Sequence, residues 1–301
     1  MTIPLPTVTP LRRSLLSVPS INQRALDKIH ALDCDGVIFD LEDSVSLDDK
    51  QRARDNLRAL FRDNPLRERE AVIRINPLDS AFGRADLDLV LELSPNAVAL
   101  PKVDTAADVE AVQGLLDRAG AASDLRIWAM MESALGVLSA GSVAAARAGA
   151  APRLDAFVVG LNDLRKETGI PPRAGRQTLV PLLMPVVLAA RAYGLGVIDS
   201  VFNDFRDAEG FEAECAQGRD MGFDGKMLIH PAQIDAANRH FGPEPEALAE
   251  AEAVIAAFAA PEAASLNVIN LHGRMVERLH LVQAEALVAQ ARRIAERKAN
   301  P

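Results

Sequence analysis

The sequence IWAMME spans residues 127–132, and the sequence AFVVGLNDL spans residues 156–164. Each begins as a short, continuous apolar run and then reaches an acid, Glu132 in the first and Asp163 in the second. Apolar runs of this length, separated by a helix-like segment, are typical of buried parallel strands. Because a crossover helix brings the carboxyl ends of parallel strands to one face, we expect Glu132 and Asp163 to be neighbours.

Two neighbouring carboxylates repel each other unless a cation lies between them. A hard divalent ion such as Mg²⁺ accepts oxygen ligands of this kind, so the pair predicts a magnesium site. The alternative interpretation is that each acid caps the helix that follows its strand. The rest of the chain favours the metal.

Six further strand-like runs precede helix-like segments, at residues 14–18, 36–41, 71–75, 97–102, 196–201 and 226–230. Eight strand–helix units over roughly 230 residues predict an α/β protein, a closed (β/α)₈ TIM barrel. The alternative, an open doubly wound sheet, usually carries a Gly-rich first turn, and the sequence contains neither G-x-G-x-x-G nor a P-loop. We expect residues 1–260 to form the catalytic barrel and residues 261–301 a C-terminal helical extension that acts as a lid or oligomerisation segment.

Composition limits the classes of partner. The 301 residues are 49% hydrophobic and 25% charged, with a net charge of −9, and a negative protein is repelled by nucleic-acid phosphates. Cys34 and Cys215 lack the spacing of a disulfide framework or a zinc site, which fits a reducing cytosol. The start of the chain, with Pro4, Pro6 and Pro10, does not resemble a signal peptide, and no apolar run is long enough to span a membrane. We therefore expect a cytoplasmic protein with neither nucleic-acid nor membrane partners.

The carboxyl ends of the predicted strands carry most of the polar groups that could do chemistry, as in barrel enzymes. These residues are Asp40, Glu42 and Asp43; Arg74 and Asn76; Lys102; Glu132; Asn162 and Asp163; Asp199; and His230. The acids predict a metal held directly by Glu132 and Asp163. Asp40, Glu42 or Asp43 would contact the metal through water, because Mg²⁺ usually keeps some of its waters.

Three basic groups at these ends allow two interpretations each. Arg74 has apolar neighbours, so its charge must be paired. Its planar guanidinium would bind a substrate carboxylate or form an ion pair with Asp40 or Glu42. Lys102 could equally be solvated. For His230, followed by a proline, a structural hydrogen-bonding turn is favoured over a catalytic role.

Six motifs occur in an order that resembles a known family. They are DLEDSV at residues 40–45, VIRIN at 72–76, LPK at 100–102, MESA at 131–134, GLNDL at 160–164 and GFDGKMLIHP at 222–231. Together they resemble the citrate lyase beta-subunit-like proteins of the HpcH/HpaI aldolase superfamily. The resemblance covers the chain from about Ser14 to Ala291.

This resemblance implies a TIM barrel and a Mg²⁺-dependent carbon–carbon lyase. Relatives of this kind cleave citryl-CoA, malyl-CoA or citramalyl-CoA to acetyl-CoA and a 2-oxo acid, or run the reverse condensation. By position, Glu132 and Asp163 match the metal ligands, and Arg74 matches the arginine that grips the substrate's oxygens. The resemblance also implies a homo-oligomer, a trimer or hexamer, in which the C-terminal segment covers a neighbour's site.

Two departures from the family pattern concern the chemistry and the CoA. The run GRMVE at residues 273–277 places Glu277 where the family has an aspartate that acts as acid and base, and Leu279 replaces a nearby proline. After the first strand, Pro19-Ser20-Ile21-Asn22 replaces Pro-Gly-Asn-Arg. Of the basic residues that face the CoA phosphates, Lys28 matches and Arg24 is displaced.

The sequence thus predicts a Mg²⁺-dependent lyase acting on an acyl-CoA. Its catalytic candidates are Arg74, Glu277, Glu42 and Asp40, and Lys28 is the candidate for binding CoA. Two alternatives stay open: an aldolase that acts on a free 2-oxo acid without CoA, and a subunit of a lyase complex that acts on an acyl carrier protein thioester.

Overall fold

The computed structural model describes residues 10–173, 175–263 and 266–299. The chain forms two compact units, one extending to Asn238 and the other beginning at Arg239.

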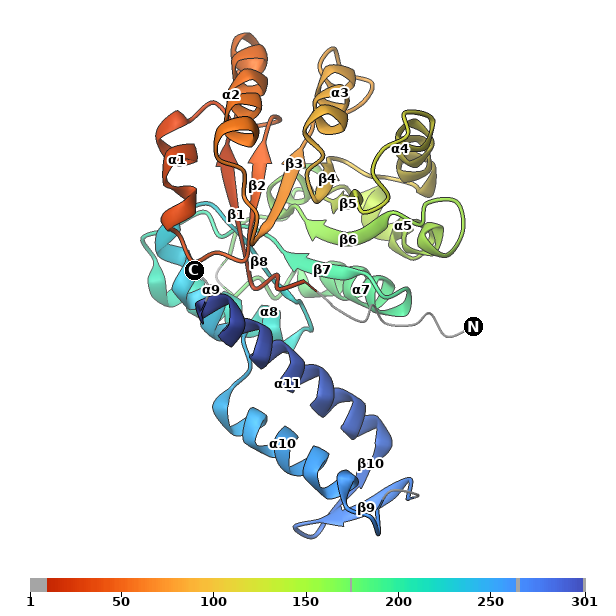
Figure 1. Cartoon of the computed structure of the whole chain (residues 1–301). Helices are drawn as coiled ribbons and strands as arrows, with labels where there is room; N and C mark the ends of the chain where they lie inside the picture. Colours follow the sequence, from red (N-terminus) through yellow and green to blue (C-terminus); the bar gives the residue numbers. More distant parts are fainter. Residues whose placement is uncertain (1–9, 174, 264–265, 300–301) are drawn as a thin grey trace. The chain divides into compact units, whose positions relative to one another are not determined.

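The first unit is a closed barrel of eight parallel strands within the described residues, with β1 paired to both β2 and β8 (Figure 1). This confirms the predicted (β/α)₈ barrel. The strands are β1 (Ser14–Pro19), β2 (Gly36–Asp40), β3 (Glu70–Arg74), β4 (Ala97–Leu100), β5 (Arg126–Met131), β6 (Leu154–Val159), β7 (Gly196–Asp199) and β8 (Gly225–Leu228).

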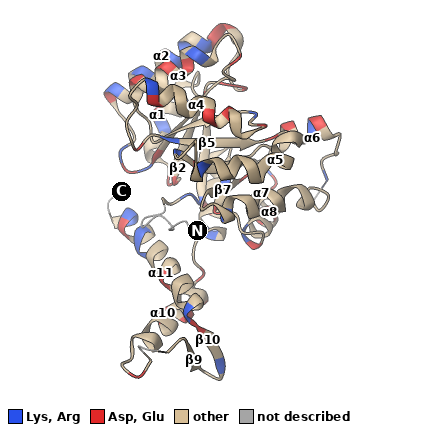
Figure 2. Ribbon diagram, turned by 90° about the vertical axis from the view of Figure 1, so that its right-hand side faces the viewer, with Lys and Arg blue, Asp and Glu red and all other residues tan. Residues whose placement is uncertain are grey.

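Helices follow the strands around the outside of the barrel. They are α1 (Gln23–Lys28), α2 (Lys50–Asp63), α3 (Gly83–Leu93), α4 (Ala106–Arg118), α5 (Ala134–Ala145), α6 (Leu161–Thr168), α7 (Val180–Ala192), α8 (Ala208–Asp220) and α9 (Ile234–His240). Short 3₁₀ turns lie at Ile29–Ala31, Leu47–Asp49, Ala146–Ala148 and Pro231–Gln233. Both signs of charge are interspersed along the outer helices α2 and α3 (Figure 2), which Arg58 and Glu92 join by an ion pair.

The barrel interior is filled by alternate residues of the strands, as expected where both faces of a parallel sheet are buried. The inward-facing cluster includes Leu15, Ile38, Val72, Ala99, Trp128, Val158, Ile198 and Met227. The residues between them face the helices. This packing fixes the strand ends, and therefore the polar residues that follow each strand. In the described parts of the chain, no helix is long and apolar enough to cross a membrane.

The second unit contains α10 (Pro245–Ala259), the antiparallel hairpin of β9 (Val268–Leu271) and β10 (Arg274–Glu277), and α11 (Arg278–Ala299). The hairpin turn places His272 and Gly273 at positive φ, as tight hairpins require. We expected a boundary after residue 260. The compact units divide earlier because Val254 and Phe258 of α10 share a small core with Val288 of α11.

Candidate active site

A cavity of about 320 Å³ lies at the carboxyl ends of the barrel strands. It brings together five of the residues predicted to hold the metal or the substrate, Asp40, Asp43, Arg74, Glu132 and Asp163. Its wall also includes Ser17, Met130, Gly160, Asn162, Ser200, Asn203, Met227 and Ile229. Residues more than 100 positions apart in the sequence thus face one space, because parallel strands end at the same face.

The guanidinium of Arg74 is held in one orientation by Asp40. Arg74 Nε and Nη2 donate to the two oxygens of Asp40 at 2.7 and 2.6 Å, and Nη1 lies 3.0 Å from Glu42 Oε2. Burial alone would raise the pKa of Asp40, but the adjacent guanidinium lowers it below its usual value. The ion pair that we considered as an alternative is therefore present, and Arg74 still lines the cavity.

The carboxylate of Glu132 lies between the ends of the two neighbouring strands. Its side chain is buried, with the residue only 3% exposed, and its Oε1 accepts a hydrogen bond of 2.8 Å from the N–H of Lys102, after β4. Gly160, after β6, lies on its other side, where any Cβ would collide with Glu132 Oε2. Burial raises the pKa of Glu132 to about 7, against the opposite effects of the Lys102 N–H and Arg74.

Asp163 sits in the first turn of α6, whose N-cap residue is Gly160. A carboxylate there is favoured by the partial positive charge of the helix N-terminus. The N–H of Leu161 donates to Ser200 Oγ at 2.9 Å, which ties the start of α6 to the end of β7. Asn162 and Asn203 exchange amide hydrogen bonds beside it.

The donor set at this cavity fits Mg²⁺. Among the described residues, no three or more His, Cys, Asp or Glu side chains are gathered so that they could hold a metal by themselves. Mg²⁺ does not need such a cage, because it is usually bound by one or two carboxylates together with waters and substrate oxygens. Glu132 and Asp163 supply two carboxylates, and Arg74 offsets the burial of Glu132 only in part.

Glu42 is a buried acid beside the cavity. It is 4% exposed, its Oε2 accepts no hydrogen bond, and its Oε1 lies 3.7 Å from Lys102 Nζ. Burial raises the pKa of Glu42 to about 7, although Arg74 opposes this. A carboxyl group with such a pKa can take or give a proton near neutral pH.

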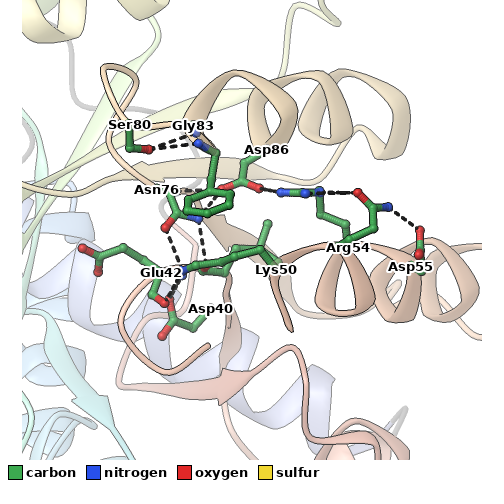
Figure 3. A network of polar contacts seen from close by, with 12 residues as sticks. Asp40, Glu42, Lys50, Arg54, Asp55, Asn76, Ser80, Gly83 and Asp86 are labelled. Atoms are coloured by element: carbon green, nitrogen blue, oxygen red, sulfur yellow. Dashed lines mark hydrogen bonds and ion pairs between the residues drawn. The ribbon is translucent and has the colours of Figure 1, made fainter. Parts of the chain in front are cut away.

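Lys50 is a buried site residue that the sequence analysis did not identify. Its ammonium donates to the carbonyl oxygens of Leu41 and Glu42, both at 2.7 Å, and to Asn76 Oδ1 at 2.8 Å (Figure 3). These bonds fix the loop that follows β2 and carries Glu42. The signal was present in α2, because Lys50 occupies the same helix face as the buried Ala53 and Leu57.

Asp86 of α3 supports the same loop from the other side. It accepts hydrogen bonds from Asn76 Nδ2 at 2.6 Å and from Arg54 Nη1 at 2.8 Å (Figure 3). Asn76 therefore connects the ends of β2 and β3 to the outer helices. Its strand-end position suggested a part in the chemistry, but its contacts are those of a supporting residue.

Other predicted residues are not among those that line this cavity, or have structural contacts. Lys28 is exposed on α1 and is not part of the cavity wall. Glu277 ends β10 in the second unit, where its N–H donates to His280 Nδ1. His230 accepts a hydrogen bond from the Ala232 N–H at 3.2 Å, in agreement with the structural interpretation.

Asp199 is also a structural residue. Its oxygens accept bonds from Arg176 at 2.6 and 2.8 Å and from Lys226 at 2.9 Å, and all three side chains are fully buried. It therefore belongs to an ion network outside the cavity.

A closed barrel with carboxylates and an arginine at the carboxyl ends of its strands defines a class of enzymes that act at that face. Residues 13–231 match the family described as HpcH/HpaI aldolase/citrate lyase, and the chain belongs to this family. The family resemblance inferred from the motifs is thus confirmed.

Three proteins of known name are similar to this chain over nearly its whole length. The chain is 44% identical to a (3S)-malyl-CoA thioesterase of Cereibacter sphaeroides, over 96% of this chain and 97% of the relative. It is 33% identical to citrate lyase subunit beta of Haemophilus influenzae, over 94% and 97%. The structure of CitE from Mycobacterium tuberculosis with magnesium, acetoacetate and coenzyme A has a TM-score of 0.73 and 30% identity, over 94% and 97%. The family thus includes both lyases and hydrolases of CoA esters.

Proposed function

We propose that this protein is a Mg²⁺-dependent carbon–carbon lyase that cleaves a 3-hydroxyacyl-CoA of the malyl-, citramalyl- or citryl-CoA type. The products are acetyl-CoA and a 2-oxo acid. The observation that carries the proposal is that Glu132, Asp163 and Arg74 line one cavity. Magnesium, acetoacetate and coenzyme A occur together in the M. tuberculosis CitE structure, which supports a CoA thioester over a free 2-oxo acid.

The residues present suit this cleavage. Mg²⁺, held by Glu132 and Asp163, would polarise the oxygens of the hydroxy-acid end as a Lewis acid. Arg74, kept in place by Asp40, donates to the thioester oxygen as that oxygen gains negative charge.

Two proton transfers complete the reaction. A base removes the hydroxyl proton, the carbon–carbon bond breaks, its electron pair forms the acetyl-CoA enolate, and an acid then protonates the enolate carbon. Glu42 is the candidate base because its pKa is near 7. Glu277 is the candidate acid by its position in the family pattern.

Hydrolysis of the thioester is the second candidate function. It is favoured by the 44% identity to the malyl-CoA thioesterase, which exceeds the 33% identity to the citrate lyase subunit. In that reaction, the same cavity would polarise the thioester carbonyl so that water attacks it, and the carbon–carbon bond would stay intact.

The products distinguish the two reactions. Purified protein is incubated with malyl-, citramalyl- or citryl-CoA, with Mg²⁺ or with EDTA. A lyase releases acetyl-CoA together with glyoxylate, pyruvate or oxaloacetate, and a thioesterase releases free CoA and the hydroxy acid. Loss of either activity in EDTA supports the metal site. If none of the three thioesters is turned over at high enzyme concentration, the proposal is rejected.

The CoA-independent aldolase and the lyase-complex subunit, the two alternatives left open by the sequence, predict different results. Turnover of free 2-oxo acid aldols without calorimetric binding of CoA would favour the aldolase. If the purified protein is inactive on CoA thioesters but active on an acyl carrier protein thioester, the subunit of a lyase complex is favoured.

We also propose that Lys28 faces the CoA phosphates and that the protein works as a cytoplasmic trimer or hexamer, with residues 261–301 as lid and oligomerisation segment. Exposure of Lys28 on α1 leaves it accessible to a ligand. Lys28→Ala should raise KM for the thioester while magnesium binding stays unchanged. Light scattering of the full chain measures the oligomer, and a monomeric mass would contradict the assembly.

A further inference from the structure

Lys102, which follows β4, has an unusual backbone conformation. Its φ is +51°, in the left-handed region that non-glycine residues rarely adopt. Strain of this kind persists only where the surrounding structure holds it, and it concentrates at functional sites.

The left-handed turn lets Lys102 reach two acids with two different groups. Its backbone N–H donates to Glu132 Oε1 at 2.8 Å, while its ammonium lies 3.7 Å from Glu42 Oε1. The side chain is 48% exposed, so the ammonium is open to solvent. Partial burial lowers the pKa of Lys102, but Glu42 and Asp163 raise it, so the ammonium is charged at neutral pH.

Two other cations at these strand ends are firmly held. Arg74 makes two short bonds to Asp40, and the ammonium of Lys50 donates to three oxygens. The ammonium of Lys102, by contrast, lies beyond hydrogen-bond distance of Glu42. Lys102 can therefore change position without breaking a buried hydrogen bond of its side chain.

The charges at these strand ends favour a divalent cation. Among the described residues there, carboxylates outnumber cationic side chains by two, with Asp40, Glu42, Asp43, Glu132 and Asp163 against Lys50, Arg74 and Lys102. A divalent ion bound there would offset the negative charge of these carboxylates. Without Lys102 the excess would be larger, and the attraction for the ion stronger.

We propose that Lys102 is a positioning residue that sets the magnesium affinity of this site, because its backbone N–H orients Glu132 and its ammonium, beside Glu42, repels a divalent ion. Its backbone holds Glu132 ready for the metal, and its side chain weakens metal binding. This role rests on the proposed metal site at Glu132 and Asp163. It is tested by binding of the metal alone, so it does not depend on which reaction the enzyme catalyses.

The experiment measures Mg²⁺ binding to the full chain by calorimetry at low ionic strength. Lys102→Met removes the charge, Lys102→Gly removes it and also relieves the left-handed strain, and Lys102→Arg keeps it. Both neutral variants should bind Mg²⁺ roughly fivefold more tightly than the wild type, an order-of-magnitude estimate for removing the repulsion between one unit charge and a divalent ion in water. The arginine variant should match the wild type, and high salt should reduce the difference.

Arg126→Met is the matched control, because it removes one positive charge from an exposed position at the opposite, amino end of β5. Its magnesium affinity should equal that of the wild type. Unchanged or weaker binding by Lys102→Met and Lys102→Gly would overturn the role of Lys102 while leaving the metal site intact. Failure of the wild type and every variant to bind Mg²⁺ would overturn both.

Discussion

Gly160→Ala is the substitution that tests the geometry of Glu132 most directly. A Cβ at residue 160 would lie 2.5 Å from Glu132 Cβ and closer still to Oε2, whereas ordinary contacts begin near 3.4 Å. Glu132 must therefore retreat by about 1 Å. Because the clash includes Cβ, rotation of the carboxylate cannot relieve it. Misplacement of a reacting group by about 1 Å can cost roughly a hundredfold in rate.

The assay has two readouts. Calorimetry measures Mg²⁺ binding, which should weaken at least tenfold by the magnitude typical of disturbed metal-ligand support, and turnover of the active CoA thioester at saturating Mg²⁺ should fall by about a hundredfold. Overpacking should also lower the free energy of unfolding by about 1–3 kcal/mol. Urea denaturation measures that term separately.

Gly141→Ala is the matched control. Gly141 lies in α5, and a Cβ there would meet no atom within 4 Å. This variant should keep its activity and gain about 0.5–1 kcal/mol of stability, as for Gly to Ala within a helix. If Gly160→Ala kept wild-type magnesium affinity and turnover, Gly160 would not control the position of Glu132, and the reasoning would be refuted.

Three further predictions concern the metal, the ion network and the thiols. Glu132→Ala or Asp163→Ala should abolish metal-dependent turnover while unfolding stays cooperative in thermal melts; lost cooperativity would indicate a structural role instead. Asp199→Asn should lower the free energy of unfolding by about 3–5 kcal/mol at pH 7 in urea, because it leaves the buried Arg176 and Lys226 to share the single carboxylate of Glu214. Although burial acts to raise the pKa of Asp199, the two cations lower it. The stability that Asp199 contributes is therefore present above its unfolded pKa and is lost as pH falls through its folded pKa. The difference in unfolding free energy between the variant and the wild type should narrow in acid. Cys34 and Cys215 are buried, and burial raises the pKa of Cys215 to about 12, so a thiol reagent should label them only after unfolding; rapid labelling of the native protein would contradict this.

The sequence by itself determined the barrel and the residues at its strand ends. Eight apolar runs alternating with helix patterns specify burial and direction, and these local properties are enough to define parallel strands whose ends meet. Glu132 and Asp163 could therefore be expected at one cavity, and both line it. The boundary of the second unit was expected too late, because the helical pattern of α10 does not show which core the helix joins.

Only the tertiary structure decided how the side chains pair. The bidentate bond from Arg74 to Asp40, the bond from Lys50 to Asn76 and the approach of Gly160 to Glu132 each join segments that are distant in sequence. The left-handed turn at Lys102 is likewise held by a hydrogen bond to another strand end. Periodicity records whether a residue faces the core, whereas pairing depends on which distant groups the closed barrel brings within a few ångströms.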